Sequence, residues 1–235
     1  MHKVTLYIVR HGQTIYNQTG RVQGWKDSPL TEEGHKVAIY CGRGLQHISF
    51  DGAYSSDLKR ASDTAKIILN ENLHKVPALQ ERNNLREISF GHFDGGLNEE
   101  RILASAKALL GEADVDLLNE KLATKEIRVR HMLNATQKID KTGTAETFEG
   151  MQLRAVQEIK NIFNQAYEER LENILVVSHG VTIASIIDYF PGVTIEQISD
   201  IKNASVSRLV FDGTDIIVES SGSMKPAEAG KMISH

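Results

Sequence analysis

The sequence is poor in two features that often decide where a protein resides. It contains a single cysteine, Cys41, among 235 residues, which excludes an intrachain disulfide framework. It has no apolar run of about 18 residues, the length of a membrane-spanning helix, and no apolar signal region ahead of its first predicted strand. We therefore expect a soluble, cytoplasmic protein.

The sequence also lacks a strong excess of charge of either sign. It has 27 basic and 31 acidic residues and a formal net charge of -4. Such a surface has no overall attraction for nucleic acid or membrane, so neither is an expected partner, and an anion site must be a local cluster of positive charge. The composition, 40% hydrophobic and 25% charged, is ordinary for a globular protein with a substantial core. It leaves the oligomeric state open.

Hydrophobic periodicity predicts an alternation of buried strands and amphipathic helices. The predicted strands are residues 4–9, 50–56 and 173–180. Four helices are predicted. The first runs from the N-cap Thr31 to about Leu45, and the last covers residues 181–190. Between them, one helix has an apolar stripe of Leu58, Ala61, Ala65 and Ile68, and another has a stripe of Val156, Ile159, Phe163 and Ala166. This order predicts an α/β fold, a three-layer α/β/α sandwich with a mainly parallel sheet.

Two regions depart from that alternation. Residues 97–145 carry helical patterns without a convincing strand, and we interpret them as a helical insertion. Residues 220–235 are rich in Ser, Gly, Lys and Ala, which predicts a loose tail. No repeat or low-complexity linker divides the chain, so residues 1–235 are expected to form a single domain.

Two predicted strands end in a histidine followed by glycine. One gives Arg10-His11-Gly12 and the other Ser178-His179-Gly180. A lone histidine at a strand end is usually structural, but two from distant segments favour a site, because ligands of parallel sheets bind beyond the carboxyl ends of the strands. Each glycine allows a close approach of backbone or ligand.

A third candidate region begins the helix after residue 56. Ser56 or Asp57 is the predicted N-cap, and the first helical turn then holds Lys59 and Arg60. Cations are unfavourable at this positive end of a helix dipole, and a bound anion would reverse that effect. We expect Lys59 to be solvated and Arg60, which adjoins the apolar stripe, to point at a ligand.

A fourth candidate is Glu87, which lies between Leu85 and Ile88. A carboxyl group in apolar surroundings can retain a proton and act as a proton donor. The alternative is an ordinary salt bridge to Arg86 or Arg82.

These segments together resemble the histidine phosphatase superfamily, which is also called phosphoglycerate mutase-like. The signature Arg10-His11-Gly12 follows the first strand, and five further matches come in the family's order. They are NQTGRVQGWKDSPLTEEG (17–34), YSSDLKRASDTA (54–65), LREISFG (85–91), ETFEGMQLR (146–154) and VVSHG (176–180). The resemblance covers about residues 3–190 without the insertion.

The resemblance implies a phosphate pocket with a nucleophilic histidine. His11 would attack phosphorus and form a phosphohistidine, Glu87 would protonate the leaving group, and no metal or other cofactor would be needed. The other implied phosphate-binding residues are Arg10, Asn17, Gln23, Gly24, Arg60 and His179. The insertion is then expected to lie over this active site as a lid.

The family contains mutases and phosphatases as well as inactive regulators. Cofactor-dependent phosphoglycerate mutases carry Arg-His-Tyr directly after the catalytic glutamate, whereas this chain has Ile88-Ser89-Phe90. The segment GHFDG (91–95) also resembles the phosphatase branch. The sequence therefore favours a metal-independent phosphatase of a small phosphorylated metabolite. A phosphoglycerate mutase and an inactive phospho-ligand-binding regulator remain the alternatives.

Overall fold

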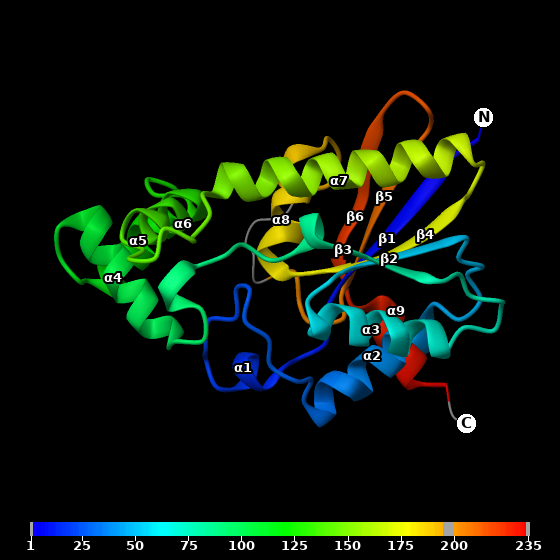
Figure 1. The fold of residues 1–235 in the computed structure, drawn as a ribbon, viewed down its shortest axis with the longest axis horizontal. Helices are drawn as coiled ribbons and strands as arrows, with labels where there is room; N and C mark the ends of the chain where they lie inside the picture. The colour runs from blue at the N-terminus through cyan, green and yellow to red at the C-terminus, as the bar shows by residue number, and fades with distance from the viewer. Residues whose placement is uncertain (1, 195–199, 234–235) are drawn as a thin grey trace. The chain divides into compact units, whose positions relative to one another are not determined.

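The structure, a computed structural model, describes residues 2–194 and 200–233 (Figure 1). Its contacts divide the chain into two compact units. The first comprises Met1–Thr14, Ser28–Glu87 and Gln152–His235, and the second comprises Ile15–Asp27 and Ile88–Met151. None of the described helices is long and apolar enough to cross a membrane. The expectation of a single domain stays a prediction.

The first unit is built on a six-stranded sheet with the order β3-β2-β4-β1-β5-β6. Strands β3, β2, β4 and β1 are parallel to one another, whereas β5 pairs antiparallel with β1 and β6 pairs antiparallel with β5. The mainly parallel sheet of the prediction is confirmed, and β3, β5 and β6 are additions to it. The strands are β1 (Val4–Arg10), β2 (Gly52–Ser56), β3 (Leu79–Arg82), β4 (Asn173–Ser178), β5 (Val206–Phe211) and β6 (Ile216–Ser223).

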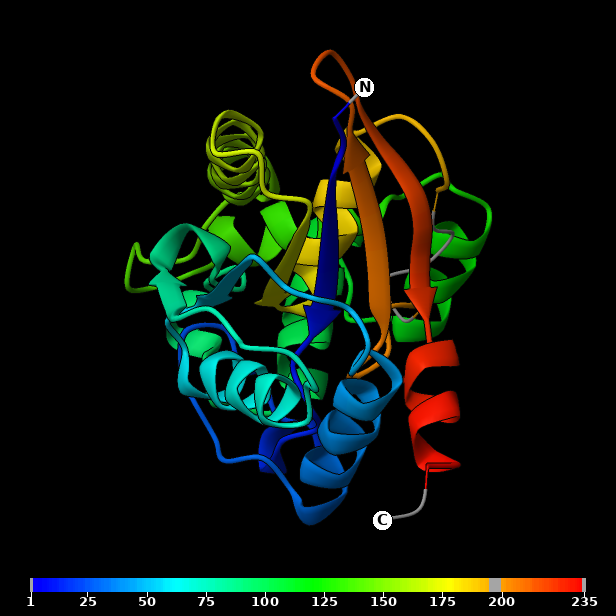
Figure 2. The ribbon, with the colours of Figure 1, turned by 90° about the vertical axis from the view of Figure 1, so that its right-hand side faces the viewer.

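Helices cover both faces of this sheet (Figure 2). One face carries α2 (Glu32–Gly44), α3 (Lys59–Asn70) and α9 (Lys225–Lys231), and the other carries α8 (Gly180–Tyr189) and the part of α7 (Phe148–Glu168) that belongs to this unit. A 3-10 turn, η1 (Asn83–Leu85), follows β3. The three-layer α/β/α sandwich is confirmed.

The alternation of side chains along β1 separates two buried cores. Leu6 and Ile8 pack with α7 and α8 in one hydrophobic cluster. Val9 packs with α2 and α3 in the other, and Tyr7 contacts that cluster. A strand buried on both faces explains why nearly all of its residues are apolar or aromatic.

The second unit is helical, as predicted for residues 97–145. Its loop around residue 140 is organised by Asp140, whose carboxylate accepts hydrogen bonds from the backbone N–H groups of His92, Thr142 and Ala145. These donors hold the pKa of Asp140 far below its ordinary value, against the effect of burial. The lid role of the insertion stays a prediction. The elements of this unit are α1 (Ile15–Gln18), η2 (Gly91–Phe93), α4 (Asn98–Leu110), α5 (Val115–Ala123) and α6 (Val129–Lys138).

The prediction of a loose tail over 220–235 is wrong for the residues that the structure describes. Strand β6 extends to Ser223, and α9 packs against α2. Small residues make this contact close: a Cβ atom on Gly230 would lie 1.8 Å from the carbonyl oxygen of Tyr40, and one on Gly44 would lie 1.9 Å from that of Pro226. A segment without large apolar residues is thus ordered by the close approach of two backbones. Residues 234 and 235 lie outside the described residues.

We expect Gly230→Ala to destabilise the protein because its methyl group would meet the backbone of α2. Overpacking of this kind costs about 1 to 3 kcal/mol in the free energy of unfolding, which urea denaturation would measure. The control is Ala229→Ser, which adds an atom to the exposed neighbour on the same helix. Equal stability of the two variants would contradict the close packing of α9 and support the prediction of a loose tail.

Candidate active site

The pairing of β1 with β4 brings the two predicted histidines together. Their parallel register places Val9 beside Val177 and Arg10 beside Ser178. His11 and His179 therefore follow at the same edge of the sheet. Their ring centroids are 5.2 Å apart, and the rings are tilted by 59°.

Of the two glycines after these histidines, Gly12 allows a close contact, as predicted. A Cβ atom on Gly12 would lie 2.6 Å from the backbone oxygen of Gly34. One on Gly180 would lie 3.4 Å from the guanidinium of Arg10. Gly12 thus admits the start of α2, whereas the space at Gly180 would accept a Cβ atom at ordinary contact distance.

The imidazole of His11 is held in one tautomer. Its Nδ1 lies 2.7 Å from the carbonyl oxygen of Gly12. A carbonyl can only accept, so Nδ1 carries the proton and Nε2 carries the lone pair. The backbone of His11 is fixed by its N–H bond to Ser178 and by the side-chain amide of Asn203, which donates to its carbonyl at 2.8 Å.

His11 is a neutral imidazole. It is only 2% exposed, and burial, followed by the charges of Arg60 and Arg10, lowers its pKa well below the ordinary value near 6.5. The free base is thus the form present at physiological pH, with its nucleophilic nitrogen Nε2 unprotonated.

Arg60 is buried as expected for a ligand-directed cation, although the predicted helix cap is wrong. The N-cap of α3 is Leu58, which makes no side-chain cap bond. The Ser56 hydroxyl instead accepts from the N–H of Leu58. Arg60 is 1% exposed, while Lys59 is solvated and pairs with Asp63 at 2.7 Å.

Thr64 ties this cation to the end of β1. Its hydroxyl donates to the backbone oxygen of Arg60 at 2.7 Å and accepts from the N–H of Gly12 at 3.0 Å. The first turns of α3 are thereby fixed to the signature loop, which holds Arg60 near His11.

Arg10 and His179 carry buried polar atoms whose partners are not found in the described part of the protein. These are Nε of Arg10 and both ring nitrogens of His179. Arg10 also donates from Nη1 to the oxygen of Ile201 at 2.6 Å. Buried polar groups are normally hydrogen-bonded, so such atoms indicate a ligand site. Burial, with the charge of Arg60 next in importance, lowers the pKa of His179 well below its ordinary value.

Glu87 lies at the N-terminus of α8. Its carboxylate accepts from the N–H groups of Val181 and Thr182, each at 3.1 Å, and from the Thr182 hydroxyl at 3.0 Å. His179, the N-cap residue, makes no side-chain cap bond. The carboxylate of Glu87 therefore does what an N-cap side chain does elsewhere, and it is stabilised by the helix dipole.

The arginines proposed as salt-bridge partners of Glu87 have other acidic partners. Arg86 makes two bonds, of 2.7 and 2.6 Å, to Asp57. Arg82 lies 3.2 Å from Glu158. The charge of Glu87 acts on Arg10, where it opposes the lowering of the pKa by burial.

Arg154 was not among the predicted site residues, although it ends the motif ETFEGMQLR. Its guanidinium donates to the backbone oxygens of Asn84, Arg86 and Glu87 at 2.7 to 2.9 Å. It also contributes to the lowered pKa of His179. In the sequence, Arg154 is a cation one residue after Leu153 on a predicted amphipathic helix. That pattern does not reveal that its side chain bonds to three carbonyl oxygens.

Three predicted phosphate-binding residues belong to the second unit. Asn17 lies in α1, and Gln23 is buried. Gly24 has φ +51°, and a Cβ atom there would lie 1.8 Å from the carboxylate of Asp94, which accepts from the N–H of Trp25. The glycine is thus required by its own turn, and the phosphate-binding role of all three stays a prediction.

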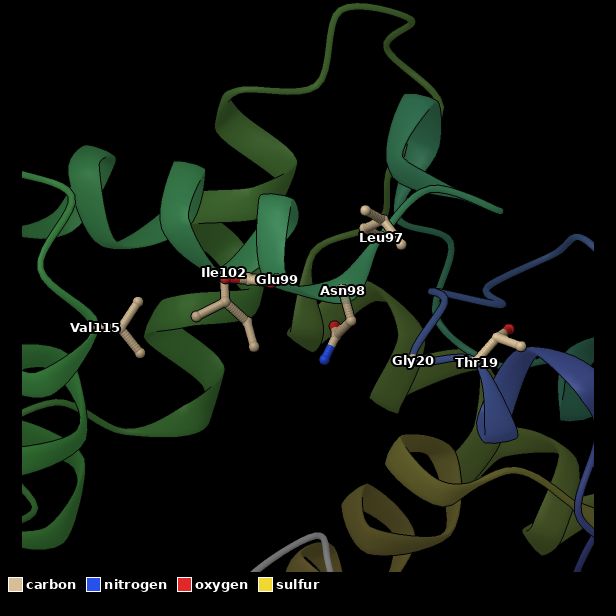
Figure 3. Close-up of a pocket in the computed structure, with 7 residues that line it drawn as sticks. All are labelled: Thr19, Gly20, Leu97, Asn98, Glu99, Ile102 and Val115. Carbon is tan, nitrogen blue, oxygen red and sulfur yellow. The ribbon is translucent and has the colours of Figure 1, made fainter.

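The second unit also contains a pocket of about 490 Å³ (Figure 3). None of the predicted site residues lines it, so pocket volume does not locate the candidate site. Among the described residues, no group of three or more His, Cys, Asp or Glu side chains is arranged to hold a metal ion. The pocket is lined by Thr19, Gly20, Leu97, Asn98, Glu99, Ile102 and Val115.

The site of the first unit combines a nucleophile, cations and a carboxyl group. A neutral imidazole lies among buried guanidinium groups, which favour an anionic ligand over a neutral one. The α/β/α sandwich thus presents, at one edge of its sheet, a histidine beside buried cations, an arrangement suited to an anionic ligand.

Comparison with known proteins supplies the family. The family profile of the histidine phosphatase superfamily, branch 1, matches residues 6–112 and 107–223. The chain belongs to this superfamily.

Individual relatives carry different activities in their names. The 2,3-bisphosphoglycerate-dependent phosphoglycerate mutase 2 of Gloeobacter violaceus is 30% identical over 201 residues, which are 84% of this chain and 80% of the relative. The fructose-2,6-bisphosphatase TIGAR B of Danio rerio is 44% identical over 85 residues, a third of each chain. The crystal structure of a phosphoglycerate mutase from Bacillus anthracis str. Sterne is 35% identical, with a TM-score of 0.87, and the match covers 98% of this chain and 97% of that one.

The buried neutral histidines predict a loss of stability on mild acidification. Their pKa is lower in the folded than in the unfolded protein, so below about pH 6.5 the unfolded chain binds more protons and the free energy of unfolding falls. Between pH 6.5 and 5.5, we expect the free energy of unfolding of His179→Gln to fall by about 1 kcal/mol less than that of the wild type. Urea denaturation at both pH values measures the difference. The control is His35→Gln at an exposed position. An unchanged loss in the His179 variant would contradict the burial of a neutral ring.

Proposed function

We propose that this protein hydrolyses phosphomonoesters of a small metabolite through a phosphohistidine on His11. The observation that carries the proposal is the fixed tautomer of His11, whose Nδ1 proton is bonded to Gly12 and whose pKa is lowered. A neutral nucleophile is thus oriented before substrate binds.

In the first step, Nε2 of His11 forms a bond to phosphorus and the bond from phosphorus to the leaving oxygen breaks. Glu87, in its protonated form, gives its proton to that oxygen. The guanidinium groups of Arg10 and Arg60 and a ring nitrogen of His179 bind the phosphoryl oxygens and stabilise their charge in the transition state.

In the second step, water attacks the phosphohistidine. The water oxygen bonds to phosphorus, the bond to Nε2 breaks, and the Glu87 carboxylate takes a proton from the water. Inorganic phosphate leaves, and His11 and Glu87 return to their starting forms. The chemistry needs a positioned nucleophile, cations and one proton carrier, so we propose no cofactor.

The segment after Glu87 supports a phosphatase over a mutase. Ile88, Ser89 and Phe90 are 1%, 3% and 8% exposed. Ser89 exchanges hydrogen bonds with Glu146 through its backbone N–H and oxygen, and the ring of Phe90 lies 4.9 Å from the guanidinium carbon of Arg101. These side chains are packed within their own unit and offer no cation to a second phosphate group.

A phosphoglycerate mutase is the second candidate, because the Gloeobacter violaceus relative and the Bacillus anthracis structure both carry that name. The two activities differ in the fate of the phosphoryl group. A mutase returns it to a phosphoglycerate, whereas a phosphatase transfers it to water. A regulator that binds without turnover would do neither.

The deciding experiment follows the phosphoryl group in the purified protein in the presence of EDTA. We expect the wild type to release phosphate from p-nitrophenyl phosphate and from a panel of phosphorylated metabolites, and to form acid-labile phosphate on His11. His11→Ala should lose both while keeping its fold by circular dichroism. Conversion of 3-phosphoglycerate to 2-phosphoglycerate faster than any hydrolysis would show a mutase, and binding without turnover would show the regulator.

Leaving-group dependence separates the roles of Glu87 and Arg60. Nitrophenolate leaves without a proton, whereas an alkoxide needs one. In single-turnover phosphorylation, Glu87→Gln should therefore lose about 10²- to 10⁴-fold on an alkyl phosphate and far less on p-nitrophenyl phosphate. Arg60→Ala, which removes a contact to the phosphoryl group itself, should lose about 10²-fold or more on both. Equal losses on both substrates for Glu87→Gln would show that Glu87 is not the acid.

A further inference from the structure

The hydroxyl of Thr182 lies between two acceptors and has one proton to give. Its Oγ1 is 2.9 Å from the backbone oxygen of Arg86 and 3.0 Å from Oε1 of Glu87. Thr182 is fully buried in the first turn of α8. Since the proton can bond fully to only one of these oxygens, the hydroxyl has two orientations of similar geometry.

The two orientations correspond to the two forms of Glu87. When Glu87 is ionised, the hydroxyl of Thr182 donates to Oε1. When Glu87 is protonated, its O–H needs an acceptor, and the N–H groups of Val181 and Thr182 that contact the carboxylate can only donate. Oγ1 can serve as that acceptor once its own proton is directed to Arg86.

The alternative acceptor is held firmly in place. The backbone oxygen of Arg86 also accepts from Nη1 of Arg154 at 2.7 Å, and the same guanidinium bonds the oxygens of Asn84 and Glu87. A carbonyl oxygen has two lone pairs, so it can accept from Arg154 and Thr182 together. The second orientation of the hydroxyl is thus available without any movement of the backbone.

We propose that Thr182 is a positioning residue that lets Glu87 carry a proton through the reaction cycle. The proposal rests on the proposed function of Glu87. Between turnovers, the proton on Oε1 bonds to Oγ1, and rotation about the bond from Cδ to Oε1 presents it to the leaving oxygen. As that proton departs, Thr182 turns its own proton from Arg86 to Oε1 and stabilises the new charge. When Glu87 takes a proton from water, the hydroxyl turns back. The Thr182 proton never leaves its oxygen.

The test uses the isosteric variant Thr182→Val, which can neither donate nor accept. We expect single-turnover phosphorylation by an alkyl phosphate to slow about 10-fold or more, an effect of the size of one hydrogen bond to a charged group, and phosphorylation by p-nitrophenyl phosphate to change less than about 3-fold. Thr182→Ser keeps the hydroxyl and should keep both rates. Ser185→Ala is the matched control, because it removes a buried hydroxyl of the same helix that donates to the oxygen of Thr182. If Thr182→Val fails to fold, Thr182→Ala takes its place.

A double-mutant cycle connects the effect to Glu87. In the Glu87→Gln background, Thr182→Val should cause no further loss on the alkyl phosphate. Equal slowing of both substrates by Thr182→Val, or a full additional loss in that background, would overturn the proposal. Failure of the wild type to form phosphohistidine, or equal losses on both substrates for Glu87→Gln, would instead overturn the function on which it rests.

Discussion

The parallel pairing of β1 with β4 is the constraint on which the site depends. Strands β1 and β4 are far apart in the sequence, but they end at the same edge of the sheet because Arg10 pairs with Ser178. The backbone bond from His11 to Ser178 continues that pairing by one residue. Every later element of the site, α3 with Arg60 and α8 with the contacts of Glu87, is attached to one of these two strand ends. A slip of one residue would turn one histidine to the opposite face.

The cost of burying charge explains the protonation states of this edge. Arg10 and Arg60 keep their charge in a buried site because a guanidinium hardly loses its proton. The neighbouring imidazoles of His11 and His179 stay neutral because burial and these cations both oppose a further positive charge. The same arrangement that keeps His11 neutral therefore favours an anionic ligand, whose charge would compensate the buried cations.

Glu87 joins the stability of the fold to the chemistry. As an ionised group it bonds the first N–H groups of α8, a helix whose N-cap residue His179 makes no side-chain cap bond. In the proposed reaction Glu87 gives up this negative charge once per cycle, and these hydrogen bonds weaken each time. Arg154 holds the backbone around it through the three carbonyl oxygens of Asn84, Arg86 and Glu87. The proposed proton carrier is thus surrounded by backbone that does not need to move.

By itself the sequence determined the parallel α/β fold, the helical character of residues 97–145 and the candidate residues His11, His179, Arg60 and Glu87. These follow from local periodicity and from polar residues at unusual positions, which are properties of neighbouring residues. The tertiary structure alone decided the tautomer of His11, the contact of Glu87 with α8, the carbonyl bonds of Arg154 and the order of the C-terminal segment. Each of those depends on contacts between distant residues. In α9 the decisive groups are small side chains and backbone, as at Gly230 against Tyr40, and a close backbone contact leaves no hydrophobic pattern in the sequence.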